Sequence, residues 1–272
     1  MTKFNRVLIT GAAGGIGTLL RSGLRGRYPV IRLTDVADMA PAGQGEEVVK
    51  ADLADYDAVE AAMRGCDAVV HLGGIATEDT WQAIERSNIQ GTYNVYEAAR
   101  QCGVSRVVFA SSNHAAGFWR RRDTIGPEVP TRPDSFYGLS KVLGEGLARL
   151  YADKHGLSSV CLRIGQFRVK PTNVRMLSLW LSHRDMVTLA LCSLEAPDIH
   201  FEVVYGVSAN TRSWYRNPGA DRIGYRPEDN AEEFASEVLG NADLEQEDPV
   251  GALFQGGPFC SGGFDGDPEQ ID

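Results

Sequence analysis

The sequence lacks a long apolar segment and a cysteine framework. No stretch of 18 apolar residues occurs in the 272-residue chain, so we expect no membrane-spanning helix, and the N-terminal residues enter a strand pattern without an apolar signal region. The five cysteines are scattered and form no C-x-x-C pair. They predict free thiols in a reducing cytoplasm rather than disulfides or a zinc site. We therefore expect a cytoplasmic protein without a bound metal.

Positive charge is also scarce. Lysine and arginine number 27 against 36 aspartate and glutamate residues, which gives a net charge of -9. Because nucleic-acid surfaces need clustered positive charge, this balance argues against a nucleic-acid partner. The one basic run, residues 120–122, is predicted to be a solvated loop.

Short apolar runs alternate with amphipathic stretches over the first 165 residues. Six runs resemble strands buried on both faces, and helical patterns separate them. This alternation predicts an α/β fold of the Rossmann type, with a doubly wound parallel sheet. The expected strands are 6–10, 30–35, 47–53, 67–74, 106–112 and 159–165, and the expected helices are 16–26, 55–64, 82–102 and 138–155.

The pattern changes after residue 165. A polar loop, a helix opened by a capping box of Ser182 and Asp185, one more strand and one more helix follow. These residues are too few for a second core of ordinary size. We expect a dinucleotide-binding domain over 1–165 and, over 166–272, a small substrate-capping region packed on the same domain. Its Gly- and Asp-rich end is predicted to be disordered.

A glycine-rich turn follows the first strand. In "TGAAGGIG", Gly11 allows the tight turn, Gly14 and Gly15 let a pyrophosphate approach the backbone, and Gly17 lets the helix pack close to the strand. Asp35, at the end of the second strand, can accept both ribose hydroxyls and repels a 2′-phosphate. Together they predict NAD rather than NADP, whereas a strand-end turn is the alternative role for Asp35.

Two more strand ends carry residues suited to the same cofactor. Asp52 and Leu53 end the third predicted strand, where a carboxylate could meet the adenine amino group. Gly73 and Gly74 end the fourth, where the backbone passes close to a ligand. Ligands bind at the carboxyl ends of strands in open α/β sheets, although simple turn chemistry would also explain these residues.

A serine, a tyrosine and a lysine have the spacing of a catalytic group. "YGLSK" places Tyr137 and Lys141 on one face of a predicted helix, and Ser112 stands at the tip of the fifth strand. A nearby ammonium and a positive nicotinamide would lower the pKa of the phenol, so that Tyr137 acts as a base. Ser112 would hold the hydroxyl that Tyr137 deprotonates. The alternative is a surface lysine beside a packed tyrosine.

In order, these motifs resemble the extended branch of the short-chain dehydrogenase/reductase superfamily over nearly the whole chain. "HLGG" and "NIQGTYN" lie between Asp35 and the strand-end serine. "VFASSNH", "LRIG", "VSANT" and "FQGG" are similar to segments of uronate dehydrogenases. That family implies NAD-dependent oxidation of the C1 hydroxyl of glucuronate or galacturonate to an aldarolactone. The superfamily also implies a homo-oligomer whose subunits meet at helices 82–102 and 138–155.

The resemblance also assigns roles to individual residues. It implies that Ser112, Asn113 and His114 bond the sugar, that Arg175 clamps its C6 carboxylate and that Phe259 helps to close the pocket. A structural turn histidine and a surface arginine are the alternatives. The expected catalytic residues are Ser112, Tyr137 and Lys141. The expected substrate contacts are Ala76, Ser112, Asn113, His114, Tyr137, Gln166, Arg175 and Phe259. The expected cofactor contacts are Gly11, Gly14, Gly15, Ile16, Gly17, Asp35, Val36, Asp52, Leu53, Leu72, Gly73, Gly74, Asn88, Ser111, Tyr137, Lys141 and Ile164.

The chain departs from that family at two substrate contacts. Ala76 replaces a serine, and Gln166-Phe167 replaces Ser-Cys. Losing one uncharged hydrogen bond costs ~0.5–1.5 kcal/mol, so we expect an altered sugar preference rather than lost activity. A dehydrogenase of another sugar or sugar acid is one alternative. A nucleotide-sugar epimerase or dehydratase is a second, although the short region after residue 165 counts against it. A redox-sensing regulator is a third, against which Tyr137 and Lys141 argue.

Overall fold

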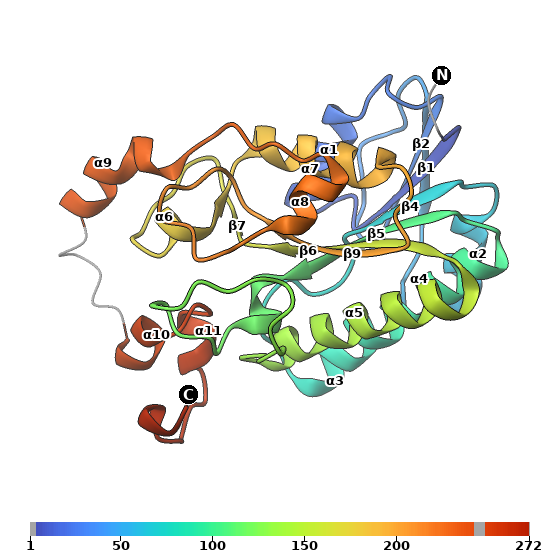
Figure 1. Ribbon diagram of the computed structural model, residues 1–272. Helices are drawn as coiled ribbons and strands as arrows, with labels where there is room; N and C mark the ends of the chain where they lie inside the picture. Colours follow the sequence, from blue (N-terminus) through green and yellow to red (C-terminus); the bar gives the residue numbers. More distant parts are fainter. Residues whose placement is uncertain (1–3, 242–247, 272) are drawn as a thin grey trace.

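The computed structural model describes residues 4–241 and 248–271. One parallel sheet has the strand order β3-β2-β1-β4-β5-β6-β9, so the winding reverses between β1 and β4 (Figure 1). The predicted doubly wound α/β fold is therefore confirmed. Its strands are β1 (Arg6–Thr10), β2 (Val30–Asp35), β3 (Glu46–Lys50), β4 (Ala68–His71), β5 (Arg106–Ser112), β6 (Ser158–Ile164) and β9 (Phe201–Gly206), and a separate small sheet pairs β7 (Gln166–Phe167) with β8 (Trp180–Leu181).

Helices cover both faces of the main sheet (Figure 1). On one face lie α1 (Gly15–Gly23), α7 (His183–Glu195) and α8 (Pro218–Ile223); on the other lie α2 (Tyr56–Met63), α4 (Gly91–Gln101) and α5 (Phe136–His155). The predicted helix 82–102 is instead three pieces: α3 (Trp81–Ile84), the π-helical η1 (Glu85–Gln90) and α4. Within the described ranges, no helix is both long and apolar enough to cross a bilayer.

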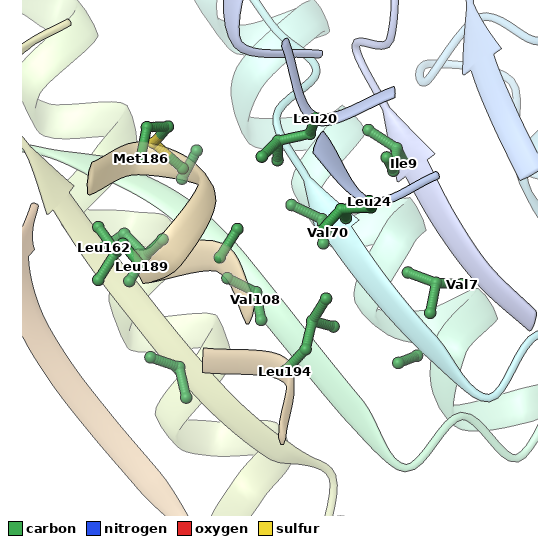
Figure 2. Close-up of a cluster of buried hydrophobic side chains, with 14 of the residues drawn as sticks. Val7, Ile9, Leu20, Leu24, Val70, Val108, Leu162, Met186, Leu189 and Leu194 are labelled. Carbon is green, nitrogen blue, oxygen red and sulfur yellow. The ribbon is translucent and has the colours of Figure 1, made fainter. Parts of the chain in front are cut away.

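Strand β5 shows how the sequence divides its side chains between the two faces. Val108 and Ala110 pack with α1 and α7, whereas Val107 and Phe109 pack with α4 and α5. Figure 2 shows the first of these layers, in which Val108 lies among leucines of α1 and α7. Because side chains alternate along a strand, Ser111 continues on the α5 face. The alternation along β5 therefore fixes the face of the sheet on which each polar side chain at its end lies.

The third predicted strand is wrong in one respect. Strand β3 is the edge of the sheet, and its residues are half-buried or exposed rather than buried on both faces. An edge strand has a neighbour on one side only, and charged side chains such as Glu47 protect it from pairing with another chain. Glu47 also pairs with Arg32 at 2.6 Å.

Residues beyond 165 contribute to the same sheet. Strand β9 pairs with β6 in parallel, and α7 packs against α1. Ser182 caps α7, since its hydroxyl accepts a hydrogen bond from the Asp185 amide at 3.0 Å. The Asp185 carboxylate does not return to Ser182 but accepts from the backbone of Glu228 and Asp229. Half of the predicted capping box is thus present.

Two predictions are wrong, one about the tail and one about the basic run at 120–122. Residues 248–271 are not disordered but form short helices, α10 (Pro249–Leu253), α11 (Pro258–Ser261) and the 3₁₀ turn η5 (Pro268–Gln270). Arg120 is not solvated: it is buried, and its guanidinium donates to the carbonyls of Pro268 and Ile271. The basic run thereby anchors the tail to the main body. The hydrogen-bond donors of Arg120 are satisfied by backbone carbonyls, which every residue has. No acidic residue in the sequence therefore marks its binding partner.

Four described elements remain: the 3₁₀ turn η2 (Asn113–Ala116), which follows β5, and a group whose apolar side chains pack together, α6 (Met176–Leu179), the 3₁₀ turn η3 (Ala231–Phe234) and α9 (Ala235–Gly240). All five cysteines are free thiols, as predicted.

Candidate active site

One large cavity opens at the carboxyl ends of the parallel strands. It has a volume of about 860 Å³ and extends from the turn after β1 to the segment after β6. Open α/β sheets bind ligands at this edge, where the winding reverses. Of the predicted cofactor and substrate contacts, all but Asn88 and Arg175 line the cavity.

The glycine turn forms one end of the cavity. Gly11 has φ of 67°, a backbone conformation that favours glycine, and a Cβ there would lie 2.7 Å from the Cα of Gly73. A Cβ at Gly17 would lie 2.4 Å from the Gly11 carbonyl oxygen. A Cβ at Gly15 would meet nothing closer than 3.8 Å, so the cavity is open above the start of α1. The amides of a helix N-terminus and this open space suit an anionic group.

Asp35 braces the glycine turn from the end of β2. One carboxylate oxygen accepts from the Ala13 amide at 2.9 Å, and the other accepts from the Ala37 amide at 3.0 Å. Each oxygen keeps a further lone pair, so a ligand hydroxyl can still donate to it. The neighbouring Val36 is 58% exposed at the edge of the cavity.

Asp52 is engaged in turn chemistry. Its carboxylate accepts from the Ala54 amide at 2.9 Å and pairs with Arg86 at 2.5 Å. These two contacts hold the pKa of Asp52 below its usual range. The next residue, Leu53, reaches the position that a Cβ of Gly73 would need, at 2.5 Å. A larger residue at position 73 would therefore require the Leu53 side chain to move.

Asn88 lies behind the cavity rather than in its lining. Its amide accepts from the backbone of Ile75 at 2.7 Å, donates back to the Ile75 carbonyl at 3.0 Å and donates to the Ser140 hydroxyl at 3.1 Å. The residue stands in the π-helical η1, a conformation often found near functional sites. Asn88 thus connects the loop after β4 to helix α5.

Helix α5 carries Tyr137 and Lys141 into the cavity beside Ser112. The Lys141 ammonium lies 5.3 Å from the centroids of both the Tyr137 and the Phe109 rings. Ser135 caps the helix, and the Glu78 carboxylate accepts from the amides of Phe136 and Tyr137 at 3.1 and 2.8 Å. An anion at a helix N-terminus is stabilising, so Glu78 fixes the backbone of Tyr137.

Burial governs the protonation of this group. It raises the pKa of the Tyr137 phenol, while a hydrogen bond with Ser112 acts in the opposite direction. Burial also lowers the pKa of Lys141 to about 8. The lowered phenol pKa that the motif predicts is therefore not a property of the protein alone, because desolvation of the phenolate outweighs the effect of the Ser112 hydroxyl.

A buried ion pair between Glu145 and Arg163 lies next to the catalytic candidates on α5 and β5. Glu145, one helical turn beyond Lys141, accepts from Arg163 at 2.8 and 2.9 Å and from the Ser111 hydroxyl at 2.6 Å. Arg163 also donates to the Tyr205 hydroxyl at 3.2 Å. Glu145 and Arg163 were not predicted as site residues, although the four-residue spacing from Lys141 places Glu145 on the same helix face.

Arg175 lies behind Asn113. Its Nε donates to the Gln255 carbonyl at 2.8 Å, and its Nη2 donates at 3.0 Å to the Asn113 amide oxygen when that amide donates to the Ile164 carbonyl. The side chain is buried, and no carboxylate among the described residues pairs with it. Burial lowers the pKa of Arg175, and Asp134 opposes this only partly and without an ion pair, so an anionic ligand in contact with the guanidinium would be stabilised.

His114 and Phe259 meet across the cavity from different parts of the chain. Their rings stack with centroids 3.9 Å apart, and Phe259 comes from α11 of the tail. The sequence reasoning missed Asp134, whose carboxylate lies 2.6 Å from His114 Nδ1. It directly precedes the N-cap of α5, where an aspartate is easily taken for turn chemistry.

The remaining side of the cavity is more exposed. Ala76 lies in the open, and Gln166 and Phe167 are half-buried. Phe167 stacks on His183 with centroids 4.5 Å apart and faces Gly15, so it lies beside the glycine turn. The Gln166 side chain makes no hydrogen bond to another residue of the described ranges. Across residues 4–241 and 248–271, no three His, Cys, Asp or Glu side chains gather as metal ligands.

Comparisons with known proteins agree with this geometry. Residues 7–183 match the NAD dependent epimerase/dehydratase family. Uronate dehydrogenase of Pseudomonas syringae pv. tomato is 46% identical, with 98% of this chain and 97% of that enzyme covered. NAD-dependent glucose-6-phosphate dehydrogenase of Haloferax volcanii is 38% identical, with 85% and 96% covered. The solved structure of a uronate dehydrogenase mutant from Agrobacterium tumefaciens, complexed with NAD, has a TM-score of 0.90 at 44% identity and covers 94% of this chain and 97% of that one.

The family match spans more than half of the chain, and the first of these relatives matches nearly all of it. The TM-score of 0.90 shows that this fold and that of the solved uronate dehydrogenase correspond over most of their length. The chain therefore belongs to the NAD dependent epimerase/dehydratase family and, within it, to the uronate dehydrogenase family.

Proposed function

We propose that this protein oxidises the C1 hydroxyl of a hexuronic acid, such as glucuronate or galacturonate, to an aldarolactone with NAD. One observation carries the proposal. A single cavity joins the glycine turn to Ser112 and Tyr137, and Arg175 lies just behind it, buried and without a carboxylate partner among the described residues. The first feature suits a dinucleotide, and the second suits a sugar that bears a carboxylate.

The residues present fit NAD. The open space above Gly15 and the amides of α1 suit a diphosphate, and Asp35 keeps lone pairs for two ribose hydroxyls. Lys141 is buried, and no carboxylate of the described residues pairs with it, so the nicotinamide ribose would supply its missing partners. When bound, NAD would supply the acceptor for the hydride that leaves C1.

Tyr137 is the proposed base. Ser112 and Tyr137 line the same cavity, and the Ser112 hydroxyl acts to lower the pKa of the Tyr137 phenol, so a substrate hydroxyl placed between them would be held by Ser112 and deprotonated by Tyr137. The raised pKa of the buried phenol means that additional positive charge is needed to form the phenolate. Lys141 supplies part of it, at 5.3 Å from the ring. Tyr137 is thus not permanently ionised, and we expect it to act as a base only when Lys141 and the bound cofactor both supply positive charge.

The proposed carboxylate site consists of Arg175 and Asn113. A guanidinium and an amide together can donate to both oxygens of a carboxylate, and hydrogen bonds to charged groups contribute about 1.5–3 kcal/mol. Arg175 Nη2 already donates to the Asn113 amide oxygen, so the two side chains are held together before the substrate binds. A substrate carboxylate would then bind to both of them.

A substrate panel tests the proposal. Initial rates of NADH formation would be measured with glucuronate, galacturonate, glucose and galactose, each with NAD and with NADP. We expect the uronic acids to be oxidised at least tenfold better than the matching neutral sugars, and NAD to be preferred because of Asp35. A neutral sugar that surpasses its uronic acid would overturn the carboxylate site, and equal rates with NADP would overturn the role of Asp35.

Two alternative functions remain distinguishable. The similarity to a glucose-6-phosphate dehydrogenase, together with Ala76 and Gln166, favours testing other sugars with an anionic group, and glucose 6-phosphate belongs in the same panel. A nucleotide-sugar epimerase or dehydratase would keep NAD through turnover. Stoichiometric NAD in the purified protein, with no net NADH formed from any sugar, would favour that function.

We also propose a homo-oligomer formed through α4 and α5. These helices expose a group of large apolar side chains, and three of them recur every seven residues along α5: Phe136, Leu143 and Leu150, with Tyr93 on α4. Such a stripe is typical of a helix that packs against another subunit. Sedimentation velocity should show a dimer or larger assembly that Leu143→Glu dissociates, and a monomeric wild type would refute it. The cytoplasmic location stays a prediction from the free thiols.

A further inference from the structure

The side chains of His114 and Asp134 form a buried pair at the edge of the cavity. His114 Nδ1 lies 2.6 Å from Asp134 Oδ2, and the two side chains are only 5% and 0% exposed. A carboxylate has no proton to donate at neutral pH, so Nδ1 must be the donor. In a neutral imidazole the other nitrogen, Nε2, is then an acceptor.

The space around Asp134 is shaped to hold this one side chain. A Cβ at Gly117 would lie 1.8 Å from Asp134 Oδ2, a Cβ at Gly256 would lie 2.0 Å from the same atom, and a Cβ at Gly138 would lie 3.0 Å from Oδ1. None of the three glycines has a positive φ, so backbone conformation does not require glycine there. Space for the carboxylate is the physical reason at Gly117 and Gly256, whereas a Cβ at Gly138 would first meet the His114 carbonyl oxygen, at 2.5 Å.

Three separate segments meet at this carboxylate. Gly117 follows η2, Gly138 lies in the first turn of α5, and Gly256 belongs to the tail. The Gly256 amide donates to the Gly117 carbonyl at 2.8 Å. The Ser135 hydroxyl donates to Asp134 Oδ1 at 2.8 Å, which fixes the plane of the carboxylate. Its second oxygen is thereby directed at His114.

The imidazole ring is fixed from its other sides as well. Phe259 stacks on it at 3.9 Å, and Tyr137 meets it edge-on with centroids 5.8 Å apart. The ring lines the same cavity as Ser112 and Tyr137. With its plane and its Nδ1 both fixed, the ring has one nitrogen left for a ligand.

We propose that Asp134 is a positioning residue that holds His114 as a hydrogen-bond acceptor through Nε2, so that the site selects a substrate hydroxyl as donor at that point. The inference rests on the proposed function for the identity of the substrate, a hydroxylated sugar acid. It rests on the structure alone for the state of the histidine. A substrate whose hydroxyl at this point is replaced by fluorine or a methyl ether loses that bond.

Asp134→Asn tests the proposal because asparagine has the same shape and fits the space between the glycines. Its amide can accept from or donate to Nδ1, so it no longer dictates which ring nitrogen carries the proton. We expect KM for the preferred uronic acid to rise about tenfold or more, with a smaller change in kcat and an unchanged Kd for NAD. Asp185→Asn is the matched control, since it changes another buried aspartate outside the cavity and should leave KM unaltered.

A double-mutant cycle separates positioning from a merely structural role. If Asp134 acts through His114, then Asp134→Asn should change KM in the wild type but not further in a His114→Gln background. Additive effects would overturn the proposal, since they would show that Asp134 acts by another route. Thermal melting of each variant with NAD bound establishes that the fold is retained.

The state of the ring can also be observed directly. With ¹⁵N-labelled histidine, the His114 resonances, assigned by their loss in His114→Gln, report which nitrogen is protonated. We expect a proton on Nδ1 and none on Nε2 in the wild type, and a mixture in Asp134→Asn. Unchanged protonation in the variant would overturn the proposal. This measurement needs no substrate, so an inactive substrate panel would refute the proposed function and leave this result standing.

Discussion

The two sides of the cavity differ in how firmly their side chains are held. The buried wall consists of Ser112, Asn113, His114 and Tyr137. The side chains of Ser112, Asn113 and His114 are hydrogen-bonded to neighbouring parts of the protein, and the Tyr137 ring packs against the rings of His114 and Phe259. The exposed wall consists of Ala76, Gln166 and Phe167, which make no side-chain hydrogen bond to one another or to the other described residues.

This difference indicates how the site divides its tasks. A side chain that is buried and bonded is fixed before a ligand arrives, which is what proton transfer over hydrogen-bond distances requires. A side chain at an open surface can be exchanged without leaving a buried polar group unpaired. We infer that the buried wall carries the chemistry and that the exposed wall sets the preference among sugars. Changes to the first should therefore have large effects, and changes to the second should have small ones.

Tyr137→Phe should have the largest effect. It removes the proposed base from the buried wall without changing the ring, and general base catalysis contributes about 10²–10⁴-fold. We expect kcat/KM for the preferred uronic acid to fall by a factor in that range, while the Kd for NAD, measured by fluorescence titration, stays the same. Tyr93→Phe removes a hydroxyl from an exposed tyrosine on α4 and serves as the control. Near-wild-type turnover by Tyr137→Phe would refute the assignment of the base.

Lys141→Met should reveal that the buried ammonium beside this wall destabilises the protein when no ligand is bound. Burial lowers the pKa of Lys141 from its ordinary 10.5 to about 8, so the unfolded chain binds more protons between these two pH values. Stability of the NAD-free protein should therefore rise with pH through that window, and below it the buried ammonium should cost the most. We expect Lys141→Met to be inactive and yet more stable than the wild type at pH 7, by on the order of 2 kcal/mol after its ring contacts are lost.

Urea unfolding of both proteins without NAD, from pH 7 to pH 10, measures this effect. The advantage of the methionine variant should shrink as the pH rises toward 10.5. If the methionine variant has a lower free energy of unfolding at every pH, then Lys141 stabilises the NAD-free fold and the prediction is refuted.

Sequence and structure agree best where a site residue belongs to a regular element. Tyr137 and Lys141 are separated by one helical turn, and the glycine turn joins a strand to a helix, so local periodicity was enough to predict that these residues would lie together. Asp134 and Glu78 were missed because they lie in loops, and their partners are 20 and 58–59 residues away in the chain. Spacing along the sequence carries no information about such pairs.

The tail shows a second limit of sequence reasoning. Its glycines and aspartates predicted disorder, yet Gly256 is one of the positions that leave room for Asp134. Arg120 holds the tail through the carbonyls of Pro268 and Ile271, and every residue has a carbonyl. Neither the space that Gly256 leaves for Asp134 nor the hydrogen bonds of Arg120 to carbonyls depend on a characteristic pair of residue types, so neither could be predicted.

Ala76→Ser should have the smallest effect and is the sharpest test of the exposed wall. Serine adds one hydroxyl at an open position, and one uncharged hydrogen bond contributes about 0.5–1.5 kcal/mol. We expect up to a tenfold change in KM for one uronic acid relative to its C4 epimer, with kcat, the Kd for NAD and the melting temperature unchanged. The same rates measured for Thr77→Ser, which alters the adjacent exposed residue of the same loop, are the control. A loss of kcat in Ala76→Ser would show that this wall also takes part in the chemistry, because a residue that only sets preference acts through binding.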